Sequence, residues 1–188
     1  MKIIPFKPSL DKLITEALLQ KPSAQEGLYK LFSRKMLSVC RMYIKDVHLA
    51  EDVMVTGFVK VFNQLNNYQN KGSFEGWIRR IMINESISFL RTQKPVYFSD
   101  DVNLVHENYT TDVTDISVED IQFLIDQLPE GYRIVFNLYA IEGYKHQEIA
   151  DLLNITESTS KSQLSRARKI LQENIKKLQN YEHKTNQH

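Results

Sequence analysis

Apolar residues recur along most of this chain with the spacing of an α-helix. Between positions 28 and 44 they fall every three or four residues, and the same rhythm returns over 50–65 and over 74–90. A period of 3.6 residues places apolar side chains on one face of each helix. The pattern predicts a first helical domain, over residues 1–92.

A polar stretch at 66–73 interrupts this pattern and contains Gly72, so it is expected to be a loop. Ser73, at its end, is placed to cap the N-terminus of the following helix. Residues 93–115 show no helical period, are rich in Asp, Asn and Thr, and contain Pro95 near their start. They are predicted to be a linker.

Helical signals resume at Ile116 and define a second domain, predicted over 116–180, with a frayed tail at 181–188. Ser117 and Asp120 have the spacing of a capping box, and Ile116 and Ile121 that of a hydrophobic staple. A further helix is expected from about Pro129 to near Gly143. The fold class is therefore all-α: two small helical domains, the first a bundle and the second a four-helix domain, joined by a flexible linker.

Charge is also distributed unevenly along the chain. The net charge of the whole chain is +1, but residues 1–94 carry +7, residues 95–132 carry −9 without a single Lys or Arg, and residues 133–188 carry +3. Two basic blocks that flank an acidic one are typical of two domains that face a polyanion and a connector that avoids it.

The second domain ends in the pattern of a helix-turn-helix. An apolar octet is followed by Asn154, which suits the left-handed geometry of a tight turn, and by Thr156, a candidate N-cap. In the last helix one seam is expected to face inward: Ser160, Leu164, Ala167 and Leu171. The opposite face combines cations with short hydroxyls, which suits the major groove of DNA, although a merely solvated basic face is the alternative. Its residues are Ser158, Lys161, Ser162, Ser165, Arg166 and Lys169.

A second polar face is expected on the third helix of the first domain, where Arg80, Asn84, Ser88 and Arg91 are spaced three or four apart. Aromatic residues and a lysine come just before it: Tyr68, Lys71, Phe74 and Trp77. Rings stack on unstacked bases, cations hold phosphates and an amide reads a base edge, so this combination suits single-stranded nucleic acid. Core packing is the alternative role for Phe74 and, more strongly, for Trp77.

At this point two segments resemble a known family. Residues 49–91, with "AED…F.KVF…SF..WI.RI..N", look like the second region of bacterial RNA polymerase sigma factors, and residues 128–171, with "LP…R.VF.LY..EGY.H.EIA", look like the fourth. The short linker and the lack of a third domain resemble the extracytoplasmic-function (ECF) sub-family.

The resemblance implies an alternative sigma factor. The first domain would bind the clamp helices of the polymerase core, then open and read the −10 promoter element as single strand. A flipped base would lie beside Tyr68–Phe74, with Trp77, Arg80 and Asn84 nearby. The last helix would read the −35 element as duplex, and Thr159 joins its contacting positions. The flap of the core and an anti-sigma protein are further partners that the resemblance implies.

One departure from the family concerns the core-binding side of the second helix. There the resemblance implies Glu51, Asp52, Val55, Thr56 and Val59, but the family usually has Gln and then Glu or Asp at the positions of Val55 and Thr56. The missing carboxylate is expected to weaken a polar contact with the core: either Glu51 and Asp52 suffice, or core affinity is lower, or the chain has a specialised partner. Ser158 replaces a glycine common in the family, which is a smaller change.

Other classes of protein fit less well. An enzyme is disfavoured because the possible metal pair His48 and Glu51 occurs once, and no glycine-rich phosphate loop or activated nucleophile is present. No metal or cofactor is expected. A one-component helix-turn-helix regulator with a helical sensor domain stays the alternative. The one cysteine, Cys40, lies in an apolar pattern and is expected in the core. The chain has no signal peptide or membrane span, which predicts a cytoplasmic protein.

Overall fold

The computed structural model describes residues 9–93 and 117–185, and every regular element within these ranges is a helix. This confirms the all-α fold class. The chain separates into two compact units, unit 1 up to Gln93 and unit 2 from Lys94 onward. Residues 94–116 and 186–188 lie outside the described residues, and so do most of the predicted linker and Ile116 of the predicted staple. The predicted domain boundaries therefore stay predictions.

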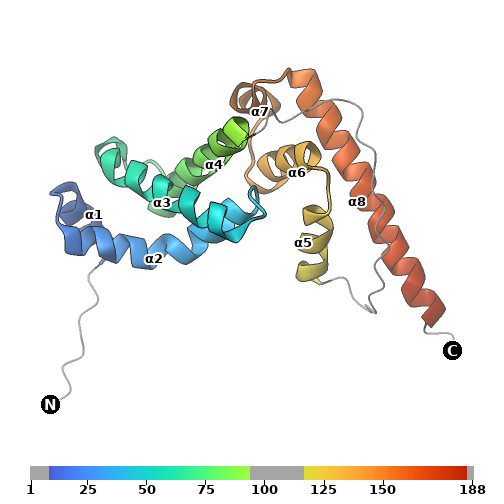
Figure 1. Ribbon diagram of the computed structural model, residues 1–188, viewed down its shortest axis with the longest axis horizontal. Helices are drawn as coiled ribbons and strands as arrows, with labels where there is room; N and C mark the ends of the chain where they lie inside the picture. Colours follow the sequence, from blue (N-terminus) through green and yellow to red (C-terminus); the bar gives the residue numbers. More distant parts are fainter. Residues whose placement is uncertain (1–8, 94–116, 186–188) are drawn as a thin grey trace, which may run out of the picture. The chain divides into compact units, whose positions relative to one another are not determined.

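Unit 1 is a bundle in which three long helices pack against one another and a short helix joins at the start (Figure 1). Its elements are α1 (Leu10–Leu18), α2 (Pro22–Arg41), α3 (Val47–Asn63), the 3₁₀ turn η1 (Leu65–Asn67) and α4 (Phe74–Gln93).

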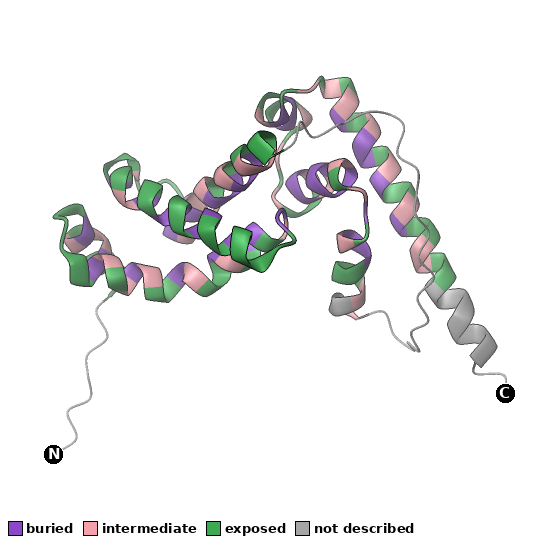
Figure 2. Ribbon diagram, in the orientation of Figure 1, coloured by how far each residue is buried: buried purple, intermediate pink, exposed green. Residues whose placement is uncertain are grey.

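Apolar side chains from the three long helices form the core of unit 1. Leu28 and Met36 on α2, and Ile78 and Met82 on α4, are completely buried. Figure 2 shows the outer side of α3 as a largely exposed surface, with its buried residues turned toward the neighbouring helices. Cys40 is buried as predicted, and this burial raises the pKa of its thiol to about 11.

Local capping explains where several helices begin. Asp46 caps α3, because its carboxylate accepts a hydrogen bond from the Leu49 backbone N–H at 3.0 Å. The predicted cap at Ser73 is present too: its Oγ accepts from the Gly76 backbone N–H at 3.0 Å at the start of α4. These polar contacts satisfy backbone donors that would otherwise lack a partner.

Unit 2 contains α5 (Val118–Asp126), α6 (Glu130–Phe136), the π-helical turn η2 (Asn137–Ile141), α7 (His146–Leu153) and α8 (Glu157–Thr185). The predicted capping box is confirmed: Ser117 Oγ accepts from the Asp120 backbone N–H, and the Asp120 carboxylate accepts from the Ser117 backbone N–H at 2.9 Å. Ile121, the other half of the predicted staple, is exposed.

The core of unit 2 packs α5 and α6 against the middle of α8. Buried side chains from the three helices, and Leu128 from the connection between α5 and α6, meet there: Leu124, Ile125, Leu128, Tyr132, Ala167 and Leu171. The helix that the sequence predicts up to Gly143 changes its hydrogen bonding at Asn137, where α6 gives way to η2. Arg133, in the same stretch, is only 1% exposed, which the sequence pattern did not indicate.

Candidate nucleic-acid interface

Unit 2 carries the predicted helix-turn-helix in α7 and α8. Asn154 ends α7 with φ 55° and ψ 49°, the left-handed conformation expected of it, and the Ile155 backbone N–H closes the turn on the Ala150 carbonyl at 3.0 Å. Thr156 Oγ1 then accepts from the Thr159 backbone N–H at 3.0 Å, which is the predicted N-cap of α8. The turn therefore fixes the direction in which α8 leaves α7.

The two faces of α8 are oriented as predicted. All four residues of the inward seam are buried: Ser160, Leu164, Ala167 and Leu171. On the opposite face Ser158, Lys161, Ser165 and Lys169 are exposed, and Thr159, Ser162 and Arg166 are partly exposed. The side chains on this outward face are therefore accessible to a ligand along the length of the helix that carries them, as contact with a DNA groove requires.

Polar contacts within this face differ from what the sequence indicated. Lys161 Nζ lies 2.6 Å from Glu157 Oε1, so a carboxylate lies at the start of the face beside the cations and hydroxyls that the sequence indicated. Thr156 Oγ1 lies 2.8 Å from both Ser158 Oγ and Thr159 Oγ1, which forms a small hydroxyl cluster. Ser162 Oγ donates to the Thr159 carbonyl at 3.0 Å. Several of the short hydroxyls thus have partners inside the helix.

The second polar face lies on α4 in unit 1. Arg80, Asn84, Ser88 and Arg91 are all exposed, as their spacing predicts. Arginine and amide groups that share one exposed side of a helix can contact phosphates and a base edge together.

The aromatic residues beside this face form one cluster. The Tyr68 ring lies 5.0 Å from that of Phe74 and 5.6 Å from that of Trp77, and the rings of Phe74 and Trp77 stack at 5.7 Å. Tyr68 Oη donates to the Gly72 carbonyl at 3.0 Å, which ties the ring to its loop. Phe74 is buried, so it supports the cluster from the inside, whereas Tyr68 and Trp77 are partly exposed and Lys71 is exposed.

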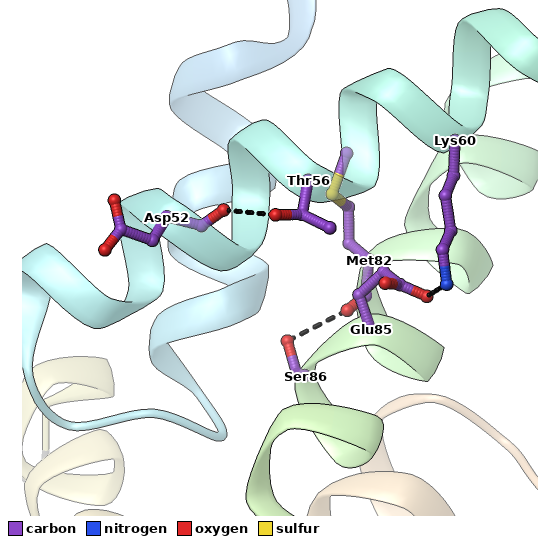
Figure 3. Close-up of polar contacts among 6 residues, drawn as sticks. All are labelled: Asp52, Thr56, Lys60, Met82, Glu85 and Ser86. Carbon is purple, nitrogen blue, oxygen red and sulfur yellow. Dashed lines mark hydrogen bonds and ion pairs between the residues drawn. The ribbon is translucent and has the colours of Figure 1, made fainter. Parts of the chain in front are cut away.

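A third surface runs along the outer side of α3. The residues predicted to bind the polymerase core are all exposed there: Glu51, Asp52, Val55, Thr56 and Val59. Val55 and Val59 are 49% and 53% exposed, which is high for aliphatic side chains. Figure 3 shows that the Thr56 hydroxyl donates to the Asp52 backbone carbonyl, at 2.9 Å, so this polar group is turned toward its own helix.

The groups considered for metal binding do not form a site. His48 Nδ1 lies 4.0 Å from Glu51 Oε2 on an exposed surface. Within residues 9–93 and 117–177 no cluster of three or more His, Cys, Asp or Glu side chains is arranged to hold a metal ion. None of the described helices has both the length and the apolar character that crossing a bilayer requires.

One group was missed by sequence reasoning. His146 stacks on the ring of Tyr139 with centroids 4.5 Å apart, and its Nδ1 lies 2.9 Å from Ser160 Oγ. Arg168 lies over the same tyrosine ring at 5.5 Å. These residues come from three different elements, so no local spacing could have revealed the contact.

Comparison with known proteins agrees with this arrangement. The family description "Sigma-70 region 2" matches residues 28–96, and "Sigma-70, region 4" matches residues 119–171. Each matched segment falls almost entirely within one of the two units. The order of the two regions is the one expected from the sequence motifs.

Curated relatives extend the similarity over nearly the whole chain. The chain is 28% identical over 183 residues to "ECF RNA polymerase sigma factor SigW" of Bacillus subtilis, covering 90% of this chain and 98% of that protein. It is 23% identical over 189 residues to "ECF RNA polymerase sigma-E factor" of Haemophilus influenzae, covering 89% and 98%.

Among solved structures, a Bartonella quintana complex of the sigma factor RpoE with the anti-sigma factor NepR is similar, with a TM-score of 0.50 and 21% identity. The match covers 80% of this chain and 96% of that one. At this identity the likeness supports the fold. From its two sigma-70 regions and its curated relatives, the chain belongs to the ECF sub-family of bacterial RNA polymerase sigma factors, and it is an alternative sigma factor that directs the initiation of transcription.

Proposed function

We propose that each of the three exposed surfaces has a separate role in promoter recognition. The outer side of α3 binds the clamp helices of the polymerase core. The α4 face and the aromatic cluster hold the −10 element as single strand, and the outward face of α8 reads the −35 element as duplex. Residues 1–92 then act as the core-binding and −10 domain, and residues 116–180 as the −35 domain, with 93–115 as their linker.

The observation that carries this proposal is the helix-turn-helix of α7 and α8. Its inward seam is buried, and its outward face presents Lys161, Arg166 and Lys169 beside short hydroxyls. Short side chains let a helix approach the floor of the major groove, while lysine and arginine reach phosphates and guanine edges. A face built only for solubility has no need of a turn that fixes its direction.

The −10 assignment is supported by the pairing of partly exposed rings with exposed amide and guanidinium groups. Tyr68 and Trp77 offer stacking surfaces, Lys71 and Arg80 offer charge, and Asn84 offers an amide that can hydrogen-bond a base edge. Phe74 holds the two rings in place from the core. Ser88 and Arg91 continue the polar face along α4.

Partners and location follow from this assignment. A sigma factor works with the core enzyme in the cytoplasm, without catalytic chemistry, metal or cofactor of its own. The Bartonella quintana sigma factor was solved with an anti-sigma factor. We infer that this chain is likewise held by an anti-sigma protein until it is needed.

The test is run-off transcription by purified core polymerase on genomic fragments, with and without the chain. New transcripts with defined start sites are expected when the chain is added, together with co-purification of chain and core. A gel shift with a promoter found in this way separates a sigma factor from a one-component regulator. The sigma factor binds tightly and specifically when core is present, and the regulator binds the duplex equally well alone. Absence of any chain-dependent transcript and of core binding would overturn the proposal.

A further inference from the structure

A surface hollow lies beside the start of α7 and the outward side of α8. It is lined chiefly by His146, by the cations Lys161, Arg168 and Lys169, and by Ser165. We name it the His146 hollow. His146 and Arg168 were not among the residues predicted to contact DNA, so the hollow extends that surface toward α7.

Two contacts hold the His146 imidazole in place. Its Nδ1 lies 2.9 Å from the Oγ of Ser160, a completely buried residue, and its ring stacks on Tyr139 with an interplanar angle of 23°. The Ser160 hydroxyl can accept a hydrogen bond from Nδ1 whether the ring is neutral or charged. The other ring nitrogen, Nε2, is then the one that can gain a proton.

The charges around this ring are unbalanced. Burial lowers the pKa of His146 most, Lys161 and Arg168 on α8 lower it further, and Glu157 raises it. Glu157 is engaged by Lys161 at 2.6 Å. On the histidine's own element, Glu148 accepts a hydrogen bond from the Lys145 backbone N–H at 2.7 Å. His146 thus lies at the edge of a cluster of cations, and its pKa in the free protein is below the ordinary value.

We propose that the His146 hollow binds a phosphate of the DNA backbone next to the −35 base pairs, and that His146 takes up one proton when this phosphate binds. The inference rests on the proposed role of α8. The proton comes from a hydronium ion or a buffer acid in the solvent: its bond to that donor breaks as one N–H bond forms at Nε2. A phosphate placed here offsets the repulsion from Lys161 and Arg168 and attracts the imidazolium directly.

Proton uptake makes promoter affinity depend on pH. Because the complex binds one proton more than the free protein, affinity falls as pH rises through the interval between the two pKa values of His146. The limit for one proton is about tenfold per pH unit. A histidine that served only to pack α7 against α8 would give no such slope.

The experiment measures binding of a labelled promoter fragment by holoenzyme between about pH 6 and pH 8, at constant salt. Wild type and His146→Gln are compared, with His48→Gln in unit 1 as the matched control. The affinity of wild type is expected to fall about threefold or more beyond that of His146→Gln over this range, and His48→Gln should follow wild type. Equal slopes for wild type and His146→Gln overturn the proposal, even if His146→Gln binds more weakly at every pH.

A second measurement needs no substitution. An NMR titration of the histidine rings in the full chain, alone and with a DNA duplex at low salt, reports the pKa of His146 directly. A rise in this pKa on addition of the duplex supports the proposal. An unchanged pKa, together with shifted signals from Lys161 and Ser165, overturns it.

The two proposals fail in different ways. If holoenzyme gives no promoter binding and the duplex does not perturb α8, the proposed function is wrong and the inference falls with it. If promoters are bound and transcribed but no proton is taken up at His146, only the present inference is wrong.

Discussion

Gly57 on α3 packs directly against the side chain of Met82 on α4, whose sulfur occupies the place that a Cβ on residue 57 would need. Figure 3 shows the Met82 side chain reaching from α4 to the ribbon of α3. Met82 is completely buried. The packing of Met82 against α3 at this point therefore depends on a residue without a side chain.

Gly57→Ala is expected to destabilise unit 1. Overpacking costs about 1–3 kcal/mol, and the better helix propensity of alanine returns roughly 1 kcal/mol. The net loss is up to about 2 kcal/mol, measured by denaturant unfolding. In a Met82→Ala background the same change should become stabilising, because the space is then free. Asn63→Ala, an exposed change on α3, is the control. A stabilising Gly57→Ala in the wild-type background would contradict the packing argument.

The surface of α3 that we propose binds the core has Val55 and Thr56 where the family resemblance implies Gln and a carboxylate. Val55→Gln combined with Thr56→Glu is expected to raise affinity for core polymerase by about twofold to fivefold, the range of one exposed ion pair. Fluorescence titration of labelled chain with core measures it. Asn63→Glu, which adds the same charge elsewhere on the helix, should have no effect. An equal gain from Asn63→Glu would show that only net charge matters.

Asn84→Ala is expected to impair promoter opening while core affinity stays unchanged, because the amide lies on the exposed face of α4 and the proposed core-binding residues all lie on α3. Permanganate reactivity of the −10 thymines in the holoenzyme complex measures opening, and core titration measures affinity. Thr92→Ala, exposed on the last turn of α4, serves as control. A loss of core affinity in Asn84→Ala would argue against its assigned role.

Glu157 forms an ion pair with Lys161 at the start of the outward face of α8. The Lys161 hydrogen bond and charge lower the pKa of Glu157, so this carboxylate is ionised at neutral pH. Glu157→Gln should therefore strengthen promoter binding a few-fold at low salt and steepen the salt dependence. Glu173→Gln, further along α8, should change affinity less. Weaker binding by Glu157→Gln would mean that the carboxylate itself orients a needed group.

The Cys40 thiol should be almost inert in the folded chain, because burial raises its pKa to about 11 and shields the sulfur from solvent. A colorimetric thiol reagent at pH 8 should react slowly with native protein and rapidly with one thiol per chain after denaturation. Cys40→Ser with Ser38→Cys, which moves the thiol to an exposed position on α2, should react at once. Rapid reaction of the native wild type would indicate frequent opening of unit 1.

Features that depend on neighbours in sequence were predictable. The Ser117–Asp120 capping box, the left-handed Asn154 and the Thr156 cap all involve residues within a few positions of one another, and each residue type has a specific conformational preference. The buried and exposed faces of α8 followed from the helical period alone.

Features that depend on contacts across the fold were not predictable in this way. From sequence alone, Gly57 would be interpreted as a residue that weakens its helix, because its contact with Met82 is not visible there. The contact between His146 and Ser160 likewise joins residues fourteen positions apart. The burial of Arg133 on α6, which packs against α8, and the change to a π-helical turn at Asn137 were not indicated by any spacing in the sequence either. Periodicity identifies which face is buried but not which partner covers it.

The hydroxyl cluster at the start of α8 bears on how this end of the helix could hydrogen-bond the edges of DNA bases. Thr156, Ser158 and Thr159 already satisfy one another at 2.8 Å, and each hydroxyl can rotate. If the outward face of α8 reads duplex DNA as we propose, a base edge at this end exchanges one hydroxyl contact for another, and rotatable hydroxyls accommodate donors and acceptors alike. Under that proposal, discrimination between promoters at this end of the helix depends on geometry along the duplex more than on any single hydroxyl.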